Sequence, residues 1–327
     1  AIFISVIAGG ILVYSFGNDP IVAYTAMIKG SLGDWNKFGE TLVTVTPLIL
    51  TGLSIAFAFK CNLFNIGVEG QFIIGAITAV WAGWALAGLP AILHLTLTLL
   101  AGAAAGGLWA SVIGWLKAKV GSHEVINGIM MNYIAMYTSN FLVKTALNIP
   151  GKAYSVEIAD TAKLWRFSQA FEQFKHSRLH IGIILSLIVA LTAYYILNKT
   201  VRGYEIRAVG FNPHAAEYGG ISVRKNIILA MIVSGLFAGL AGAIMTTGVQ
   251  YRVNNLFGFT VILSAFLFGV MQKGGPLMQI QGIPKEVVGI IQGIIILFVA
   301  ANFVKVVMEN IKQRKDLKRT AVKEEVE

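Results

Sequence analysis

Nearly uncharged stretches follow one another along most of this chain. They are Ala1–Asn18, Thr41–Phe59, Cys61–Leu116, Val125–Val143, Ile181–Asn198, Asn226–Tyr251, Val253–Gln272 and Val287–Val304. Most are close to the roughly 20 residues that a helix needs to cross the hydrocarbon core of a bilayer. Cys61–Leu116 is long enough for two helices, and we expect it to divide near Gly88-Leu89-Pro90. The pattern therefore predicts an all-α polytopic membrane protein with about 8–10 transmembrane helices, some of them broken or re-entrant.

Composition agrees with a membrane location. Of 327 residues, 56% are hydrophobic and only 13% are charged, whereas soluble domains carry about a quarter charged residues. The mean hydropathy is +0.71. No cleavable signal peptide is visible, and the chain begins inside an apolar stretch without a start methionine, so we expect the natural N-terminus to lie upstream of Ala1.

Basic residues predict the orientation of the chain. The formal net charge is +10, and Lys and Arg concentrate at Lys117 and Lys119, in 199–225 and in the tail 305–327. Because such residues favour the cytoplasmic side, we expect all three there, with 147–178 as an external loop or short surface helix. We expect one membrane domain over 1–304 followed by the basic cytoplasmic tail. No basic helix face with interleaved aromatics is present, so we expect no nucleic-acid partner.

Counting crossings from this orientation exposes a conflict. With 199–225 inside, the last three uncharged stretches would leave the basic tail outside. Either Val253–Gln272 does not cross simply, or residues are missing from that region.

The sequence contains no catalytic constellation. It lacks a phosphate-binding G-x-x-x-x-G-K-[ST] loop, so any ATP must be hydrolysed by another chain. The histidines are scattered. His176 and His180 are four residues apart, but we favour a solvated surface over a metal site for this pair. Cys61 is the sole cysteine and is expected to be a packed thiol. We therefore expect no enzymatic activity, metal or cofactor on this chain.

Polar residues interrupt the apolar region at Asn62–Gln71, which holds two Asn, two Gly, one Glu and one Gln. The glycines permit a broken helix, and the polar groups can satisfy the freed backbone or face a water-filled route. Glu69 is a functional candidate because an acid near the membrane is costly. The alternative, that Glu69 caps a helix start in solvent, stays open.

The basic loop 199–225 contains a strong helix signature. Asn212 is suited to an N-cap, Pro213 to the first turn, and Gly219-Gly220 to the helix end. These residues predict a short helix over 213–218. A rigid capped helix in a cytoplasmic loop suits mechanical coupling to a soluble partner; the alternative is a surface helix without a partner.

Two other features concern the spans themselves. Asn127, Met130, Met131, Tyr133 and Tyr137 recur at roughly helical spacing. They could face a pathway, with amides bonding a neutral polar solute and rings stacking on a base, or they could make ordinary interhelical hydrogen bonds. In addition, the glycine pairs 102/106 and 235/239 have the spacing that permits close helix contact.

Several of these stretches together resemble the permease subunits of simple-sugar and nucleoside ABC importers. They are Phe64-Asn-Ile-Gly-Val-Glu-Gly-Gln71, Arg207-Ala-Val-Gly-x-Asn-Pro-x-Ala-Ala-x-Tyr-x-Gly-Ile221 and Ser234-Gly-Leu-Phe-Ala-Gly-Leu-Ala-Gly-Ala243. Ser122-His-Glu-Val-Ile-Asn127 and Met131-Asn-Tyr133 are closer to the nucleoside branch. The resemblance extends over nearly the whole chain.

The resemblance implies a set of partners in a bacterial cell membrane. A second, related permease subunit would complete the pore, often as a heterodimer. ATP-binding subunits would hold ATP and Mg beneath it, and an external solute-binding protein or lipoprotein would deliver the solute. The family's coupling loop maps onto Gly203–Ile221, which would dock on the ATPase and drive alternating access.

The resemblance and the motifs together give two sets of expected site residues. Those expected to couple to the ATPase are Gly203, Glu205, Arg207, Gly210, Asn212, Pro213, Ala215, Ala216 and Tyr218. Those expected along the translocation pathway are Phe64, Asn65, Glu69, Gln71, Asn127, Met131, Asn132 and Tyr133.

Two alternatives to a nucleoside importer remain. One is a simple-sugar permease of the ribose or galactose type. The other is a secondary transporter driven by an ion gradient, with Glu69 as the proton carrier and broken helices at the site. A membrane scaffold without transport is disfavoured by the polar interruptions.

One departure from the family falls where the crossing count fails. After Gly258-Phe259 the family carries about a dozen further residues, by resemblance, whereas Thr260 here runs directly into an apolar stretch. We therefore expect a break or an absent loop near 259–261, which a Cα–Cα spacing of ~3.8 Å in a continuous chain would contradict.

Overall fold

The computed structural model of the chain describes residues 2–15, 17–150, 152 and 154–253, together with the single positions Pro276 and Gly289. The chain divides into two compact units, one made of 1–37 and 267–327 and the other of 38–266. Several expected features lie outside the described residues: nearly all of the spans 253–272 and 287–304, the break near 259–261 and the tail 305–327.

The N-terminal part of the first unit consists of two helices. α1 (Ile2–Ser15) occupies the apolar stretch Ala1–Asn18, and α2 (Pro20–Leu32) follows it. Asp19 caps α2 by accepting a hydrogen bond from the Ile21 amide at 2.8 Å, and Pro20 occupies the first turn. The sequence reasoning missed α2 because its apolar run is short and contains Lys29.

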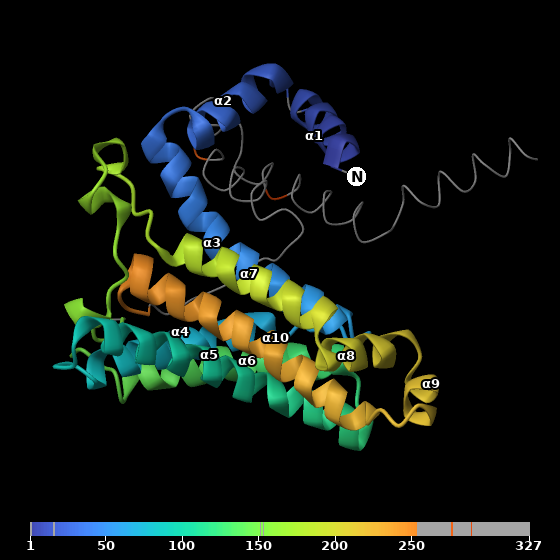
Figure 1. Cartoon of the computed structure of the whole chain (residues 1–327). Helices are drawn as coiled ribbons and strands as arrows, with labels where there is room; N and C mark the ends of the chain where they lie inside the picture. Colours follow the sequence, from blue (N-terminus) through green and yellow to red (C-terminus); the bar gives the residue numbers. More distant parts are fainter. Residues whose placement is uncertain are drawn as a thin grey trace, which may run out of the picture. The chain divides into compact units, whose positions relative to one another are not determined.

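Long helices dominate the second unit (Figure 1). This unit begins at Phe38, within the first turn of α3. In the described residues the long helices are α3 (Trp35–Phe59), α4 (Val68–Ala85), α5 (Ala91–Trp115), α6 (Glu124–Lys144), α7 (Gly182–Lys199) and α10 (Val223–Met245). Two shorter helices, α8 (Val201–Phe211) and α9 (Pro213–Tyr218), lie between α7 and α10 in the sequence. Short π-helical turns extend two of the long helices: η1 (Leu116–Val120) follows α5, and η5 (Thr246–Gln250) follows α10. The helix bounds fit the uncharged stretches, and the division of 61–116 falls at the expected Gly88–Pro90.

Membrane-spanning character is clear in four of these elements. Trp35–Phe59, Ala91–Val120, Gly182–Lys199 and Val223–Gln250 are long and apolar enough to cross a bilayer. The described residues contain no strand, only isolated bridges. The expected all-α polytopic class is confirmed.

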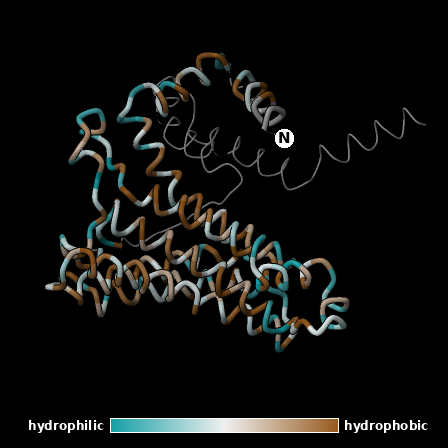
Figure 2. The backbone as a smooth tube through the Cα atoms, viewed as in Figure 1, coloured by the Kyte–Doolittle hydropathy of each residue, from teal (hydrophilic) through white to brown (hydrophobic). Residues whose placement is uncertain are grey.

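The helices α3, α4, α5, α6, α7 and α10 run between two ends of the second unit. At one end lies the segment 147–181, which contains the 3-10 turns η2 (Asp160–Ala162), η3 (Phe167–Gln169) and η4 (Glu172–Phe174). At the other end lie α8 and α9 (Figure 1). Apolar residues line the helices, and polar residues gather towards these ends (Figure 2). The segments 147–178 and 199–225 are therefore at opposite ends, while the side of the membrane that each one faces stays a prediction.

The segment 147–181 is tied to the helices. Arg178 donates from Nη2 and Nε to the two carboxylate oxygens of Glu40 in α3, at 2.6 and 3.2 Å, and its amide donates to the same carboxylate at 2.7 Å. The amide of Ala159 donates to the Gly83 carbonyl at 2.8 Å. These bonds hold an irregular segment firmly against the ends of α3 and α4.

Glycines bring α4, α5 and α10 into backbone contact. A Cβ on Gly106 would lie 2.5 Å from the Gly235 carbonyl oxygen and 2.6 Å from the Gly239 Cα. A Cβ on Gly75 would overlap with the backbone of Gly239 in the same way. The glycine pairs 102/106 and 235/239 thus face each other, as their spacing indicated. The helices approach as closely as their main chains permit.

We predict that Gly239→Ala lowers the stability of the bundle. The new methyl group would overlap with the backbone of Gly102 and Gly106, which no rotamer change relieves. Overpacking of this kind costs about 1–3 kcal/mol. Thermal unfolding of the purified protein in detergent measures the effect. Gly219→Ala is the control because its Cβ would meet nothing closer than 3.5 Å; equal midpoints for the two variants would contradict the packing argument.

Candidate functional site

Two capped helices form the candidate coupling element, which we define as residues 200–221. The Thr200 hydroxyl accepts a hydrogen bond from the Gly203 amide at 3.1 Å and caps α8. Asn212 Oδ1 accepts from the amides of His214 and Ala215 at 3.0 and 3.1 Å and caps α9. The expected helix 213–218 is confirmed with its expected cap, whereas α8 was not anticipated.

One face of the coupling element is packed against the rest of the second unit. Gly203 lies against the carbonyls of Ile196 and Leu197, and Gly210 lies against the Lys60 carbonyl. Between them Ile206 and Val209 are each 1% exposed, and Ala216 of α9 is also buried. They belong to one apolar cluster with Phe57, Cys61 and Leu63. Gly203, Gly210 and Ala216, which were expected to couple to the ATPase, therefore also pack within the chain, and their role in coupling stays a prediction.

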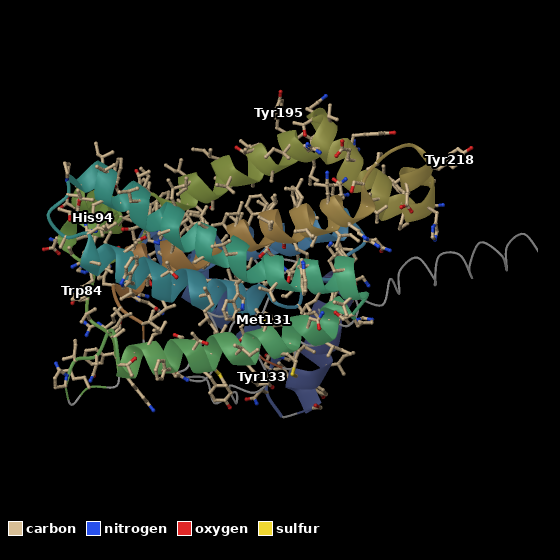
Figure 3. The ribbon with its side chains drawn as sticks, turned by 90° about the horizontal axis from the view of Figure 1, so that it is seen from below. Trp84, His94, Met131, Tyr133, Tyr195 and Tyr218 are labelled. Carbon is tan, nitrogen blue, oxygen red and sulfur yellow. The ribbon has the colours of Figure 1, made fainter. Side chains whose placement is uncertain are left out.

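The opposite face of the coupling element is open and aromatic. Tyr204, Phe211 and Tyr218 are 60%, 90% and 98% exposed, and Tyr218 projects from the tip of α9 (Figure 3). A cavity of about 400 Å³ lies beside them, lined in part by Asn212 and Ala215. Of the expected coupling residues, Asn212, Pro213, Ala215 and Tyr218 are thus accessible. Tyr204 and Phe211 were missed. Their seven-residue spacing places them on one face of α8, and this face is opposite the buried residues Ile206 and Val209.

The charged residues of α8 make contacts within the chain. Glu205 Oε2 pairs with Arg202 Nη1 at 2.9 Å and accepts a bond from Asn226 Nδ2 of α10 at 3.4 Å. Arg207 Nε donates to the Gly203 carbonyl at 3.4 Å. Glu205 therefore fastens α8 to the start of α10.

The expected helix break is present between α3 and α4. Asn62 adopts a left-handed conformation with φ of +56°. Asn65 and Gln71 exchange two amide hydrogen bonds, of 2.9 and 3.0 Å, and Asn65 Nδ2 also donates to Ser234 Oγ of α10 at 2.8 Å. Ser234 in turn bonds the Ser54 carbonyl at 2.7 Å. The side chains of Ser54, Asn65, Gln71 and Ser234 are fully or almost fully buried.

Asn132 of α6 also secures this break. Its Oδ1 accepts from the Gly70 amide at 2.8 Å, and its Nδ2 donates to the Ile66 carbonyl at 3.0 Å. A side chain expected on the pathway thus supplies the hydrogen bonds that the interrupted backbone lacks. Glu69 is half-buried in the first turn of α4, and Phe64 is 43% exposed.

Among the other expected pathway residues of α6, Met131 lies on a different side from the rest. Met131 is 9% exposed and packs inward, whereas Met130, Tyr133 and Tyr137 are 52%, 54% and 66% exposed (Figure 3). Asn127 bonds the Ser122 hydroxyl at 2.5 Å. Spacings of three and four residues place Asn127, Met130, Tyr133 and Tyr137 on one side of the helix, whereas Met131 points to another side. A role of these residues in the pathway stays a prediction.

His180 corrects another expectation. It is 1% exposed rather than solvated, because its ring packs directly against Gly248 of η5 and Gly182 of α7. Its Nδ1 accepts from the Gly182 amide at 3.1 Å. Burial, with the nearby Arg166 charge, lowers the pKa of His180 to about 4. In the described residues no group of three His, Cys, Asp or Glu side chains suits a metal.

Comparison with known proteins gives a consistent result. Residues 38–271 match the family described as branched-chain amino acid transport system / permease component. The guanosine ABC transporter permease protein NupP of Bacillus subtilis (strain 168) is 43% identical, over 96% of this chain and 95% of its own. The nucleoside ABC transporter permease protein NupB of Lactococcus lactis subsp. cremoris (strain MG1363) is 34% identical, over 94% of this chain and 91% of its own.

Further relatives match less closely. A second guanosine ABC transporter permease protein of the same Bacillus, NupQ, is 31% identical over 72% of this chain and 76% of its own. Permeases named for sugars match at 30% and 25% identity. No solved structure matches the chain.

We predict that acid destabilises the protein through His180. The unfolded chain binds a proton near the ordinary pKa of 6.5, whereas the folded chain resists it to about 4. Stability is therefore full above pH 6.5 and falls by up to about 3 kcal/mol as the pH approaches 4. His180→Asn, which keeps an acceptor for the Gly182 amide, should flatten this part of the curve of unfolding midpoint against pH. Parallel curves for variant and parent would refute the assignment.

Proposed function

Because this chain belongs to the family of branched-chain amino acid transport system permease components, we propose that it is the membrane-spanning permease of an ATP-driven importer that carries nucleosides into the cytoplasm. The relatives named for guanosine and nucleosides, which align with nearly its whole length, support this solute class. The chain itself has no phosphate-binding loop, so its partners supply the ATP hydrolysis.

The main support for a coupling role is that the coupling element has one buried face and one exposed aromatic face. Ile206 and Val209 on its inner face are buried against the helices. Tyr204, Phe211 and Tyr218 on the other face are exposed. Exposed aromatics on a rigid helix are the side chains that dominate protein interfaces. We propose that they dock on an ATP-binding subunit, which holds ATP and Mg.

A continuous path joins the coupling element to the helix break. Gly210 of α8 rests on the backbone of Lys60, and Val209 and Ala216 share a cluster with Cys61 and Leu63. Asn65, two residues further on, is bonded to Gln71 and Ser234. Movement of α8 would therefore shift the start of α4 relative to α10. In this proposal Phe64, Glu69, Asn127 and Tyr133 border the solute route that opens.

The proposed complex contains a second, related permease. Two guanosine permeases of one Bacillus, NupP and NupQ, are both similar to this chain, which supports a pore of two different subunits. An external solute-binding protein would deliver the nucleoside. With the coupling element and the tail placed in the cytoplasm, 147–178 faces the outside, where that protein would approach.

We predict that Phe211→Ala and Tyr218→Ala weaken association with the ATP-binding subunit about tenfold or more, because each removes a large exposed ring from the docking face. Pull-down with graded subunit concentrations measures the affinity, and ATP hydrolysis driven by solute measures the coupling. Tyr195→Ala is the matched control, since this tyrosine is 61% exposed on α7 and is not part of the coupling element. Wild-type affinity in both coupling variants would remove the basis of the docking proposal.

We further predict that reconstituted uptake of labelled guanosine requires ATP and the ATP-binding subunit, and that unlabelled nucleosides compete for it. Competition by ribose or galactose instead would identify a sugar permease, a possibility raised by the sugar-named relatives. Uptake that follows a proton gradient without ATP would show a secondary transporter.

A further inference from the structure

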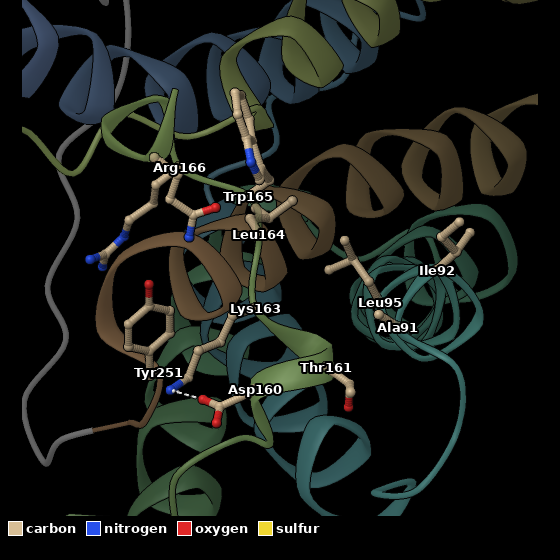
Figure 4. Close-up of a pocket in the computed structure, with 11 residues that line it drawn as sticks. Ala91, Ile92, Leu95, Asp160, Thr161, Lys163, Leu164, Trp165, Arg166 and Tyr251 are labelled. Carbon is tan, nitrogen blue, oxygen red and sulfur yellow. Dashed lines mark hydrogen bonds and ion pairs between the residues drawn. The ribbon is translucent and has the colours of Figure 1, made fainter. Parts of the chain in front are cut away.

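A cavity of about 680 Å³ opens beside the segment 147–181, at the end of the second unit opposite α8 and α9 (Figure 4). One wall is apolar and includes Ile92 and Leu95 of α5. The other is polar and includes Lys163, Arg166 and Tyr251. None of these residues was singled out from the sequence or used in the proposed function.

Arg166 has unused hydrogen-bonding capacity in this cavity. Its Nε is buried without a hydrogen-bond partner among the described residues. Among the residues that the structure describes, its Nη2 donates only to the Gly248 carbonyl, at 3.4 Å. The guanidinium carbon lies 4.9 Å from the centre of the Tyr251 ring, which holds the group in place. A planar guanidinium with a free N–H is suited to a phosphate or carboxylate.

The local charges leave Arg166 uncompensated. Lys163 pairs with Asp160 at 2.7 Å and with Glu157 at 3.1 Å. Arg252 pairs with the second oxygen of Glu157 at 3.7 Å. Within the described residues, none of the ion pairs of this cluster includes Arg166. Of the charged residues that line the cavity, the two cations Lys163 and Arg166 face one carboxylate, Asp160. The lining thus retains one positive charge, which matches a ligand with a single negative charge.

The apolar wall indicates what else the ligand carries. Ile92 is 85% exposed in the first turn of α5, where the candidate membrane span Ala91–Val120 begins. Trp165, which also lines the cavity, is 41% exposed, and Trp and Tyr are enriched at the boundary between membrane and water. The cavity therefore adjoins both the hydrocarbon beside α5 and the water beyond it.

We propose that this cavity binds the headgroup of an anionic phospholipid. The phosphodiester accepts hydrogen bonds from the Arg166 guanidinium and neutralises its charge, and an acyl chain lies along α5 over Ile92. A free phosphate would satisfy the guanidinium but leave the apolar wall exposed. The proposal requires only that α5 spans the membrane, so it stands apart from the identity of the transported solute.

The test uses the purified full chain in a non-ionic detergent, with lipid binding followed by native mass spectrometry. Phosphatidylglycerol should bind, whereas phosphatidylcholine and inorganic phosphate at equal concentration should bind much more weakly. Arg166→Gln should lower the affinity for phosphatidylglycerol about tenfold, the effect of losing charge-assisted hydrogen bonds. Lys175→Gln, an exposed cation of the same segment outside the cavity, should leave it unchanged.

A second variant guards against misfolding of Arg166→Gln. Ile92→Asn alters a largely exposed side chain and should lower phosphatidylglycerol affinity while leaving the unfolding midpoint unchanged. Equal losses in Arg166→Gln and Lys175→Gln would overturn the site. So would equal binding of phosphatidylcholine, equal binding of inorganic phosphate, or no effect of Ile92→Asn. If Arg166→Gln left lipid binding unchanged but weakened the binding of a solute-binding protein, the cavity would be a protein docking site. That result would also reject the proposal.

Discussion

The main chains of α4, α5 and α10 touch at Gly75, Gly106 and Gly239, with no side chain between them. In lipid the hydrophobic effect does not drive helices together, so close packing must supply the attraction. Contact between backbones gives many short-range dispersion contacts at once. This triple crossing fixes the position of α10, and α10 carries both Ser234, which closes the helix break, and Asn226, which holds Glu205. The features proposed for transport therefore depend on where the glycines allow the helices to meet.

Polar groups near the crossing are arranged so that an interrupted helix survives in an apolar setting. A break between α3 and α4 frees backbone donors and acceptors, which cannot remain unpaired in hydrocarbon. Asn132 bonds the freed groups of Ile66 and Gly70, and Asn65 and Gln71 bond each other. The same residues that looked suited to a solute are needed to keep the break intact. A role in transport, if these residues move, would come through exchange of these bonds.

Much of the fold could be predicted from the sequence, because its strongest signals are local. Uncharged runs of spanning length gave the helices, and the Asn212 cap with Gly219 gave α9 within its observed bounds. α8 was missed because Gly203 and Gly210 lower helix propensity, and its buried face is apparent only once Lys60 and Leu197 are placed against it. In α6 the helical spacing groups Met130, Tyr133 and Tyr137, but spacing alone does not show that Met131 packs inward. His180 looked solvated because nothing local shows that a distant stretch folds over it. The unpaired guanidinium of Arg166 could not be predicted either, because it depends on the ion pairs that Lys163 and Arg252 form with Glu157 and Asp160 in the folded chain.

The reciprocal bonding of Asn65 and Gln71 has a consequence for how the chain can move. Each amide satisfies the other, and both are shut away from water. Pulling the two apart would lose both bonds; Asn65 would keep its bond to Ser234, but the Gln71 amide would be unmet in buried surroundings, which is costly. Small separations are thus disfavoured, so in the proposed transport cycle the pair would act as a latch that is either shut or fully released. A pore gated by such a latch would switch between discrete states instead of leaking gradually.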